Sequence, residues 1–370
     1  MNPASLAKRS VRAGVRRALS VAPVRRLVEG ELASASNARK AGHAAAPAGP
    51  SRTFTDSRGV VHPLDMTLRD RLKPNWRVML DTDQAAAPPS DETLRGRVRK
   101  AAKSVGELER VLALTTGTSV SGRILEIGCF DGSAAFELSK RPGTTVVASD
   151  LARYYVTQRP GQAEDEAIAA EEVALATLRS RAGRIAGRPD GSVTFVEDDI
   201  TTSSLEPGSF DLLVSFEVLE HVADPPGSFA AMAWLLRPGG VAYHDYNPFF
   251  SQIGGHSLAT LDFPWGHVRL DAIDVERYLR EVRTIELEQD LRFYRDSLNR
   301  MTLADLRDAI AGAGLETIAI LPWYQRSLLG EVTPQVLDEA RATYPRATLE
   351  DLLGTFVAVV IRKPSSVDQG

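Results

Sequence analysis

The 370-residue sequence has a single cysteine, Cys129, which excludes an internal disulfide framework and a zinc site built from several thiolates. It also lacks any apolar run near the roughly 20 residues that a membrane-spanning helix needs. Its formal net charge of −4 leaves no basic surplus, so we do not expect nucleic acid as a partner. Apolar residues (43%) and charged residues (25%) are present in the proportions of a globular protein. We therefore predict a soluble, cytoplasmic protein without a transmembrane segment.

The first 50 residues differ from the rest, because nine lysines and arginines stand against only Glu29 and Glu31. This composition predicts a disordered arm, or an amphipathic helix over residues 6–27 that makes weak contact with an anionic membrane surface or a partner through residues 1–40. The segment has no apolar core of a secretory signal, whereas a transit peptide remains an alternative. Residues 51–119 are predicted to form an N-terminal cap with a helix over 91–114.

One stretch organises the remainder of the chain. An apolar strand over 124–127 enters a turn between Gly128 and Gly132, a helix follows over 134–140, and a second apolar strand over 145–149 ends on Asp150. Glycine lets the backbone approach a ligand closely, a helix N-terminus favours negative charge, and a terminal acid can accept hydrogen bonds from two ribose hydroxyls. The pattern therefore predicts half of a nucleotide-binding, doubly wound sheet.

Strand and helix signals continue to alternate after Asp150, which predicts right-handed crossovers and a mostly parallel sheet. The alternation breaks at 247–300, a length that is typical of a functional insertion or lid. It returns with a helix over 303–313 and ends with a helical insertion at 334–353 and a tail at 363–370. The other predicted helices are 162–181, 226–236 and 272–282, and the other strands are 193–196, 210–215, 241–245, 316–321 and 355–361.

Five motifs in this order resemble those of class I S-adenosylmethionine (SAM)-dependent methyltransferases, in the group typified by methyltransferase-11-like domains. They are Leu125-Glu126-Ile127-Gly128 with Gly132, Asp150, Asp198-Asp199-Ile200, the segment Phe210 to Val222 containing Glu217-Val218-Leu219-Glu220-His221, and Leu236-Arg237-Pro238-Gly239-Gly240. The resemblance implies a methyltransferase domain over residues 120–362 with a Rossmann-like α/β fold of seven strands, of which the last is reversed. It also implies SAM as the cofactor.

The resemblance also implies roles for single residues. Asp150 would bind the ribose hydroxyls, and Asp199 would accept from the adenine amino group, with Asp198 as the alternative in register. Glu126 and Gly128 would shape the pocket around the methionine part of SAM. The full predicted cofactor set is Glu126, Gly128, Phe130, Gly132, Asp150, Asp198, Asp199, Ile200, Ser215, Phe216 and Glu217.

The glycine turn departs from the family at one position, because a glycine is common where this chain has Phe130. Its ring must fold away from the methionine part of SAM or pack over it. A nicotinamide dinucleotide is the alternative cofactor. The spacing does not fit G-x-G-x-x-G, however, because Phe130 and Ser133 stand where glycines are needed.

Four histidines follow strands or lie in the insertion, where a general base for methyl transfer is expected. His256 is the first candidate, because Gly254-Gly255 places its imidazole on a ligand-accessible loop. His267 and His244 come next, and His221 is either catalytic or structural. A metal site made of His256, Asp262 and His267, with Asp245 as a fourth ligand, is a weaker alternative. The set lacks helical or hairpin ligand spacing, so no metal is assigned.

The insertion is rich in aromatic, polar and glycine residues, which suits an acceptor with hydroxyl groups and a flat apolar face. We therefore predict methyl transfer from SAM to a small molecule or saccharide, at oxygen rather than at nitrogen or carbon. A catalytically silent, methyltransferase-like binding or scaffold protein is the alternative. The sequence does not indicate an oligomeric state.

Overall fold

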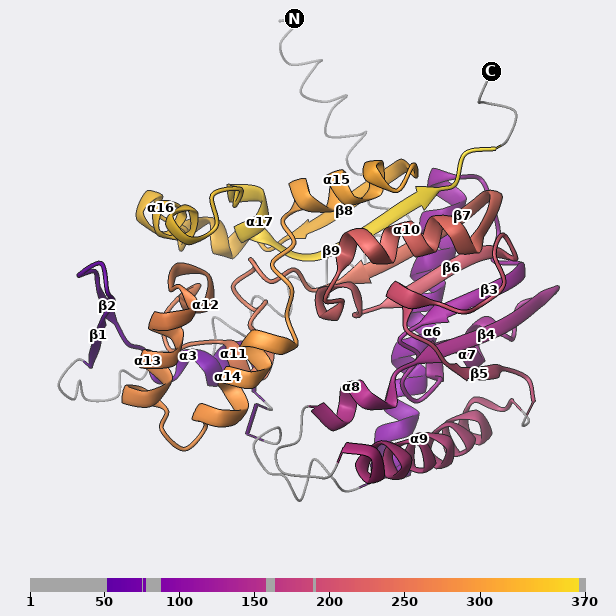
Figure 1. The fold of residues 1–370 in the computed structure, drawn as a ribbon, viewed down its shortest axis with the longest axis horizontal. Helices are drawn as coiled ribbons and strands as arrows, with labels where there is room; N and C mark the ends of the chain where they lie inside the picture. The colour runs from indigo at the N-terminus through magenta and orange to yellow at the C-terminus, as the bar shows by residue number, and fades with distance from the viewer. Residues whose placement is uncertain (1–51, 75, 78–87, 158–163, 189–190, 366–370) are drawn as a thin grey trace, which may run out of the picture. The chain divides into compact units, whose positions relative to one another are not determined.

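A computed structural model describes residues 52–74, 76–77, 88–157, 164–188 and 191–365 (Figure 1). The predictions for the basic arm therefore lie outside the described residues, as do those for the last five residues of the tail. None of the helices in the described ranges is long and apolar enough to cross a lipid bilayer.

Seven strands form one sheet in the order β5-β4-β3-β6-β7-β9-β8. Only β9 is antiparallel to its neighbours β7 and β8, which confirms the predicted doubly wound sheet with a reversed last strand. The chain crosses back over the sheet between β5 and β6, which places the carboxyl ends of β3 and β6 beside each other at the switch point, where such sheets bind ligands. The strands are β3 (Gly122–Ile127), β4 (Thr144–Asp150), β5 (Thr194–Glu197), β6 (Phe210–Phe216), β7 (Leu236–Tyr246), β8 (Glu316–Tyr324) and β9 (Gly354–Arg362).

Helices cover both faces of this sheet (Figure 1). One face buries Ile124 and Val146 against α6 (Asp91–Thr115), α7 (Ser133–Leu138) and α9 (Glu164–Ala186). The other buries Leu125 and Val147 against α10 (Pro225–Leu235) and α15 (Leu303–Gly312). Neighbouring residues of one strand thus enter opposite cores, because successive side chains of a strand point to opposite faces. This double burial explains why the central strands are apolar throughout.

Two local features differ from the prediction. The helix expected over 162–181 begins at Glu164 and continues to Ala186, and a short helix, α8 (Ala152–Thr157), comes directly after Asp150. Six residues are too few to show a helical period, so periodicity does not reveal α8. The fifth strand, expected over 241–245, begins at Leu236, because the Arg237-Pro238-Gly239-Gly240 segment is already part of β7.

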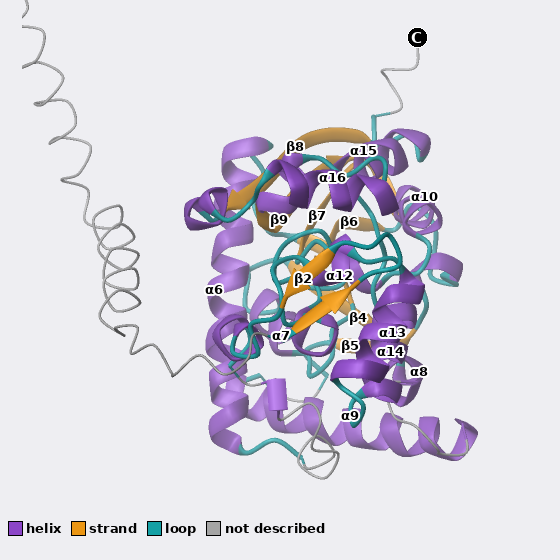
Figure 2. Ribbon diagram, turned by 90° about the vertical axis from the view of Figure 1, so that its left-hand side faces the viewer, coloured by secondary structure: helices purple, strands orange, loops and turns teal. Residues whose placement is uncertain are grey.

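Three stretches far apart in the sequence share a third hydrophobic core, which we call the cap. They are residues 52–72, 247–298 and 328–353, and they pack Phe54, Phe263 and Leu352 together. Figure 2 shows the hairpin of the cap and α12 in front of the strands of the sheet. The cap contains β1 (Thr53–Thr55), β2 (Val61–Pro63), α3 (Leu68–Leu72), α11 (His256–Ala259), α12 (Gly266–Arg269), α13 (Ala272–Val282), α14 (Leu287–Asp296), η3 (Arg326–Gly330), α16 (Pro334–Thr343) and α17 (Leu349–Leu353).

Buried polar contacts join the three stretches of the cap. Arg69 of α3 forms ion pairs with Glu286 and Asp290, and the Trp265 indole N–H donates to the Leu352 carbonyl at 3.1 Å. Breaking one partner of a buried ion pair leaves an uncompensated charge, which is strongly destabilising. The early segment around α3 is therefore an integral part of the wall beside the sheet edge.

Candidate active site

The predicted site residues divide between two regions at the carboxyl ends of β3, β4 and β6, and the segment after β6 contacts the cap. The cofactor half consists of the glycine turn, Asp150 and residues 198–200. The acceptor half consists of residues 217–221 after β6 and of Asn247 to His256, where β7 enters the cap. Both halves contain strained backbone, because Phe130, Glu217 and His256 have φ of +45°, +57° and +52°. Such strain in non-glycine residues clusters at functional sites.

The glycine turn in the cofactor half is tightly enclosed. A Cβ on Gly128 (φ +72°) would lie 2.5 Å from a Val218 methyl group, and one on Gly132 (φ +75°) would lie 2.7 Å from the Phe195 ring. Both positions thus require glycine for conformation and for space. Gly132 is also the N-cap of α7. The backbone of the turn is therefore closely packed where that helix begins.

Glu126 is a buried carboxyl group at the end of β3, only 3% exposed, and its Oε2 atom has no hydrogen-bond partner. Burial, followed by the charges of Asp131 and Asp150, raises its pKa well above the usual range. A buried acceptor without a donor is costly unless a ligand supplies one. The ammonium group of the methionine part of SAM is such a donor, so the residues present fit the cofactor that the resemblance implies.

Asp150, at the end of β4, is surrounded by donors. Its carboxylate accepts from the backbone N–H groups of Phe130 and of Leu151 (2.8 Å) and from the Tyr155 hydroxyl at 3.1 Å. Arg179 of α9 places its guanidinium 3.7 Å away. Burial raises the pKa of Asp150, while the Leu151 and Phe130 hydrogen bonds oppose the shift. Ribose hydroxyls would therefore have to share this carboxylate with Tyr155.

Phe130 adopts the left-handed backbone conformation (φ +45°), which explains why glycine is common at this position of the family. Its ring lies 5.2 Å from that of Tyr155 and 5.0 Å from the Arg97 guanidinium, measured between centroids and to the guanidinium carbon. The ring therefore packs against α8 and the side chain of Arg97. Phe130 and Tyr155, which donate to Asp150 through a backbone N–H and a hydroxyl, thus also form an aromatic pair with each other.

The two acids after β5 both stabilise their own loop. Asp199 accepts from the Thr201 N–H at 2.8 Å as the cap of the short helix η1 (Ile200–Thr202), and Asp198 accepts from the Ser204 N–H at 2.9 Å. The second carboxylate oxygen of Asp198 is buried without a partner. The choice between Asp198 and Asp199 as the adenine acceptor stays a prediction.

Ser215 and His244 face each other across β6 and β7, beneath the sheet rather than at its edge. The Ser215 hydroxyl lies 2.8 Å from His244 Nδ1, and the imidazole ring packs edge-on against Phe229 of α10. His244 is fully buried, which lowers its pKa to about 3. The structure therefore does not bring His244 to the other candidate histidines.

Phe216 is the last residue of β6, and Glu217 follows it towards the acceptor half. The Phe216 ring lies 6.1 Å from that of Tyr243. Glu217 forms an ion pair with Lys100 of α6 at 2.5 Å and accepts from the Asn247 side-chain amide at 3.3 Å. Burial alone would raise the pKa of Glu217, but Lys100 lowers it below the usual range. Glu217 thus carries a negative charge at the boundary between the two halves.

His221 and His256, which are 35 residues apart in the sequence, come together with Glu220. Their ring centroids are 5.1 Å apart, and one nitrogen of each lies within 4.8 Å of a Glu220 carboxylate oxygen. Burial raises the pKa of Glu220 to about 8 and lowers the pKa of both imidazoles. Neutral imidazoles keep a lone pair that can accept a proton, so this cluster suits the chemistry of an acceptor hydroxyl.

His267 and Asp262 lie elsewhere in the cap. His267 Nε2 donates to the Phe249 carbonyl at 2.9 Å, and burial lowers its pKa to about 4. The Asp262 carboxylate forms an ion pair with Arg283 at 2.9 Å and accepts from the Tyr278 hydroxyl. The metal site weighed for His256, Asp262 and His267 is therefore not assembled.

Sequence reasoning missed several residues of this site. Glu220, Asn247, Tyr155 and Arg179 were not assigned a role. The juxtaposition of Glu220 and His221 directly after a strand was a usable signal for the first, since both then lie at the carboxyl edge of the sheet. Tyr155 and Arg179 carry no such signal, because their contacts with Asp150 depend on how α8 and α9 pack.

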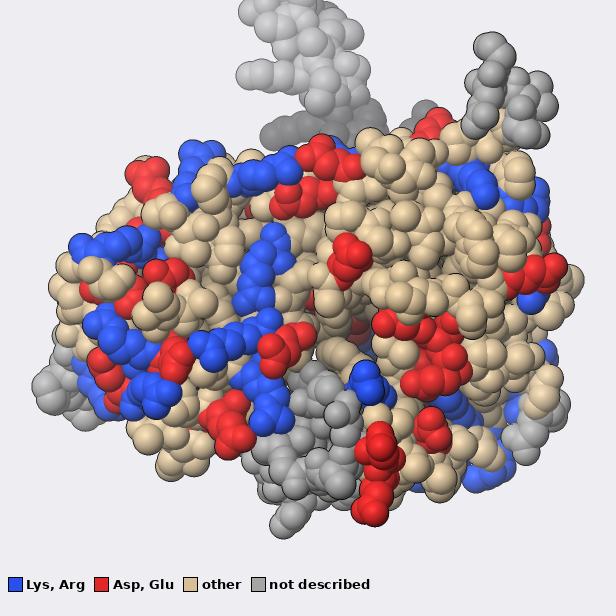
Figure 3. All heavy atoms as spheres, in the orientation of Figure 1, with Lys and Arg blue, Asp and Glu red and all other residues tan. Residues whose placement is uncertain are grey.

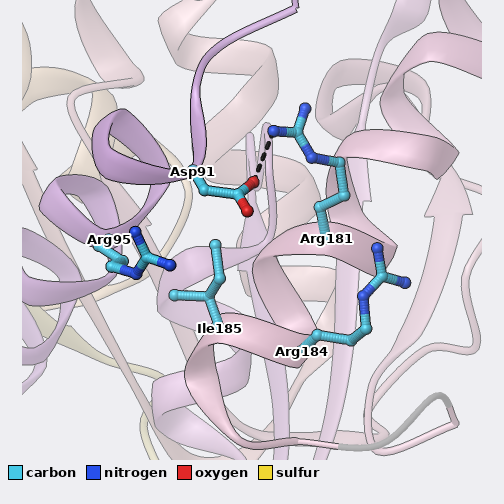
Figure 4. Close-up of a pocket in the computed structure, with 5 residues that line it drawn as sticks. All are labelled: Asp91, Arg95, Arg181, Arg184 and Ile185. Atoms are coloured by element: carbon cyan, nitrogen blue, oxygen red, sulfur yellow. Dashed lines mark hydrogen bonds and ion pairs between the residues drawn. The ribbon is translucent and has the colours of Figure 1, made fainter.

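A hollow of about 460 Å³ lies between the start of α6 and α9 and is lined by Asp91, Arg95, Arg181, Arg184 and Ile185 (Figure 4). Arg181 donates to Asp91 there at 2.7 Å. The hollow contains none of the predicted site residues, so we do not assign it to the reaction.

Figure 3 shows charges of both signs interspersed over the cap on the visible face, without a broad basic patch.

A family model described as a methyltransferase domain matches residues 98–320, more than half of the chain. Ubiquinone biosynthesis O-methyltransferases are similar. That of Xanthomonas campestris pv. campestris (strain B100) is 35% identical over 121 residues, 33% of this chain and 41% of that protein. That of Xanthomonas euvesicatoria pv. vesicatoria is 29% identical over 60% of this chain and 77% of that protein. The chain thus spans less than half of the first relative.

A solved structure of a putative sarcosine dimethylglycine methyltransferase from Galdieria sulphuraria is 16% identical, with a TM-score of 0.42 over 71% of this chain and 86% of that chain. The family model, the strand order with its reversed last strand, and the glycine turn with its buried acids agree with one another. The chain belongs to the class I SAM-dependent methyltransferases.

Proposed function

We propose that this protein transfers the methyl group of SAM to an oxygen of a small hydroxylated molecule. The observation that carries the proposal is the meeting of Glu220, His221 and His256 in the acceptor half. A hydroxyl must lose its proton as it attacks the methyl group, and the two neutral imidazoles of this cluster, beside the Glu220 carboxyl group, offer lone pairs for it. The names of the similar ubiquinone biosynthesis O-methyltransferases support oxygen as the acceptor atom.

In this proposal, the cofactor half binds SAM and the acceptor half binds the acceptor. Glu126, Gly128, Phe130, Gly132 and Asp150 hold the methionine and ribose parts of SAM. One of Asp198 and Asp199, with Ile200, holds the adenine. The cap positions the acceptor in line with the methyl–sulfur bond, and such positioning can supply much of the rate. His256 and His221 remain the histidine candidates at the reacting hydroxyl, whereas His244 and His267 lie in packed interiors.

Aromatic rings around the cluster favour an acceptor with a flat apolar part. Phe293 of α14 lies 5.9 Å from the His256 ring, and Tyr154 of α8 lies 5.6 Å from the His221 ring, between centroids. Flat rings of an acceptor can stack on such side chains. Saccharides also present hydroxyls and one apolar face, but we rank hydroxylated aromatic acceptors above them for this reason.

An acceptor screen tests this function. The purified full chain is incubated with SAM and panels of catechols, phenols, saccharides and amines, and S-adenosylhomocysteine (SAH) release is measured together with product mass. The expected result is SAH release with a hydroxylated acceptor and a product heavier by one methylene unit at oxygen. Turnover confined to amines or carbon acceptors would contradict the proposal.

A further inference from the structure

The hollow between the start of α6 and α9 gathers positive charge. Of the described residues that line it, three are arginines and one, Asp91, is an acid, so two positive charges are in excess. Figure 4 shows Arg95 on one side of Asp91 and Ile185, and Arg181 and Arg184 on the other. The volume of about 460 Å³ is typical of a pocket for a small ligand.

Helical spacing brings these side chains to one place. Asp91 and Arg95 are four residues apart in α6, and Arg181, Arg184 and Ile185 are three and four residues apart in α9. Residues with these spacings lie on one face of a helix. Because both helices pack against the same face of the sheet, their charged faces meet at the hollow.

Asp91 neutralises one of the three arginines. The half-buried Arg181 donates to its carboxylate at 2.7 Å and to the Pro89 carbonyl at 2.8 Å. The pKa of Asp91 lies below its usual value, first because of the Arg181 hydrogen bond and then because of the charges of all three arginines. Three guanidinium groups therefore act on a single carboxylate.

Arg95 and Arg184 keep most of their charge available to a ligand. Among the described residues, Arg184 donates only to the uncharged Ser180 hydroxyl, at 2.9 Å. Arg95 lies 3.7 Å from Glu92 in an exposed ion pair, and such pairs contribute little to stability. Like charges that line one hollow repel each other, so a bound anion would relieve a cost that the chain bears.

We propose that this hollow binds a phosphate monoester, a small organic molecule with one terminal phosphate group. Such a group carries about −1.5 to −2 charge at pH 7, which matches the excess charge of the lining. Guanidinium groups bind phosphate oxygens through two parallel hydrogen bonds, which fixes the orientation of the anion. The Ile185 side chain offers an apolar contact to the organic part, which favours a monoester over inorganic phosphate.

The hollow lies close to two other arginines, which hold the glycine turn. In α6, Arg97 forms an ion pair with Asp131 at 3.2 Å, and its guanidinium lies over the Phe130 ring. In α9, Arg179 donates to the Phe130 carbonyl at 2.9 Å and lies 3.7 Å from Asp150. A ligand that holds α6 and α9 together therefore also holds two contacts of the cofactor half. We expect this ligand and SAM to change each other's affinity by the same factor, as thermodynamic linkage requires.

Calorimetry with phenyl phosphate on the SAH-saturated full chain tests the site, since bound SAH keeps the probe out of the cofactor half. The expected result is saturable binding. Arg95→Gln and Arg184→Gln should each weaken the affinity about tenfold, because each removes a charge-assisted hydrogen bond to the phosphate. Arg110→Gln is the matched control and should bind like the parent. Arg110 is an exposed arginine of the same helix, about 22 Å along its axis from Arg95.

Two further probes define the ligand. Inorganic phosphate should bind more weakly than phenyl phosphate, and equal affinity would reduce the site to one for an adventitious ion only. Vesicles of phosphatidylcholine with phosphatidic acid carry the same phosphate group on a lipid. Vesicle binding that Arg184→Gln weakens would identify a lipid as the source of the phosphate, whereas vesicle binding that it leaves unchanged would support a soluble monoester.

The outcomes that would overturn the proposal are direct. One is the absence of saturable phenyl phosphate binding in a parent that binds SAH, and another is equal affinity in the parent, Arg95→Gln and Arg184→Gln. Saturating phenyl phosphate should change SAH affinity at least about twofold in the parent and less in Arg184→Gln; an unchanged SAH affinity would overturn the coupling. None of these measurements uses a methyl acceptor, so their failure is distinguishable from failure of the proposed O-methylation.

Discussion

The cofactor half and the acceptor half of this site are built in different ways. Most of the cofactor half comes from one stretch in which β3, the glycine turn, α7 and β4 follow one another, and only residues 198–200 come from the loop after β5, so residue spacing sets most of its geometry. The acceptor half joins the end of β6, the start of the insertion after β7, and cap helices that pack on α3. Its geometry depends on a separate hydrophobic core. A site can thus keep one cofactor while the cap determines the acceptor.

The unpartnered polar atoms of the two halves face different parts of the proposed reaction. In the cofactor half, Asp150 accepts three hydrogen bonds from the chain, whereas Glu126 and Asp198 each keep an unpartnered buried oxygen. In the acceptor half, the unpartnered buried atoms belong to Glu220 and His256. We expect substitutions in the acceptor half to change the chemistry, and those in the cofactor half to change affinity or stability.

His256→Ala is expected to have the largest effect. Losing a group that handles the acceptor proton typically costs 10²–10⁴-fold in rate, and about 10²-fold corresponds to roughly 2.7 kcal/mol in the barrier. SAH affinity should change less than about twofold. Steady-state turnover and SAH calorimetry measure the two quantities. His62→Gln is the control, because His62 is a buried imidazole of the cap that pairs with Asp56 instead. An unchanged turnover would remove His256 from the mechanism.

Asp150→Ala should have the next largest effect, on affinity. Charge-assisted hydrogen bonds to ribose hydroxyls contribute about 1–3 kcal/mol, so SAM and SAH should bind roughly 10- to 100-fold more weakly. Glu197→Ala is the matched control, because Glu197 is paired in register with Asp150 at the same sheet edge. Equal SAH affinity in Asp150→Ala and the parent would mean that another acid holds the ribose.

The different construction of the cofactor half and the acceptor half also explains how much of the site could be predicted from the sequence. The alternation of strands and helices and the glycine turn follow from local periodicity and spacing, whereas the reversed last strand was implied by the family resemblance, and the structure confirms them. His256 was placed in the insertion as the leading base, but its pairing with His221 and Glu220 required the packing of the cap. The prediction of His244 as a candidate base was misleading, because a position near the end of a strand does not show on which face of the sheet the side chain lies. It points beneath the sheet, where Ser215 and Phe229 surround it.

Gly128→Ala tests the close fit of the glycine turn. A left-handed conformation costs a residue with a side chain about 1–2 kcal/mol, and the new Cβ would also lie 2.5 Å from Val218. Gly143→Ala is a control with almost the same φ, +71°, and nothing within 4 Å of its Cβ. Denaturant unfolding should show a greater loss of stability for Gly128→Ala. Equal losses of stability in the two variants would mean that the Val218 side chain moves away from the new Cβ without a measurable cost in free energy.

Tyr155→Phe should have the smallest effect, and its sign is informative. The Tyr155 hydroxyl donates to Asp150, the residue that we propose binds the ribose hydroxyls, so in that proposal SAM would share or displace it. A typical hydrogen bond contributes about 0.5–1.5 kcal/mol net, so removing this competitor should strengthen SAH binding about two- to tenfold. The ring remains to pack on Phe130, 5.2 Å away. Calorimetry measures the change, and weaker binding would mean that the hydroxyl contacts the cofactor, so that α8 belongs to the cofactor half as a binding element.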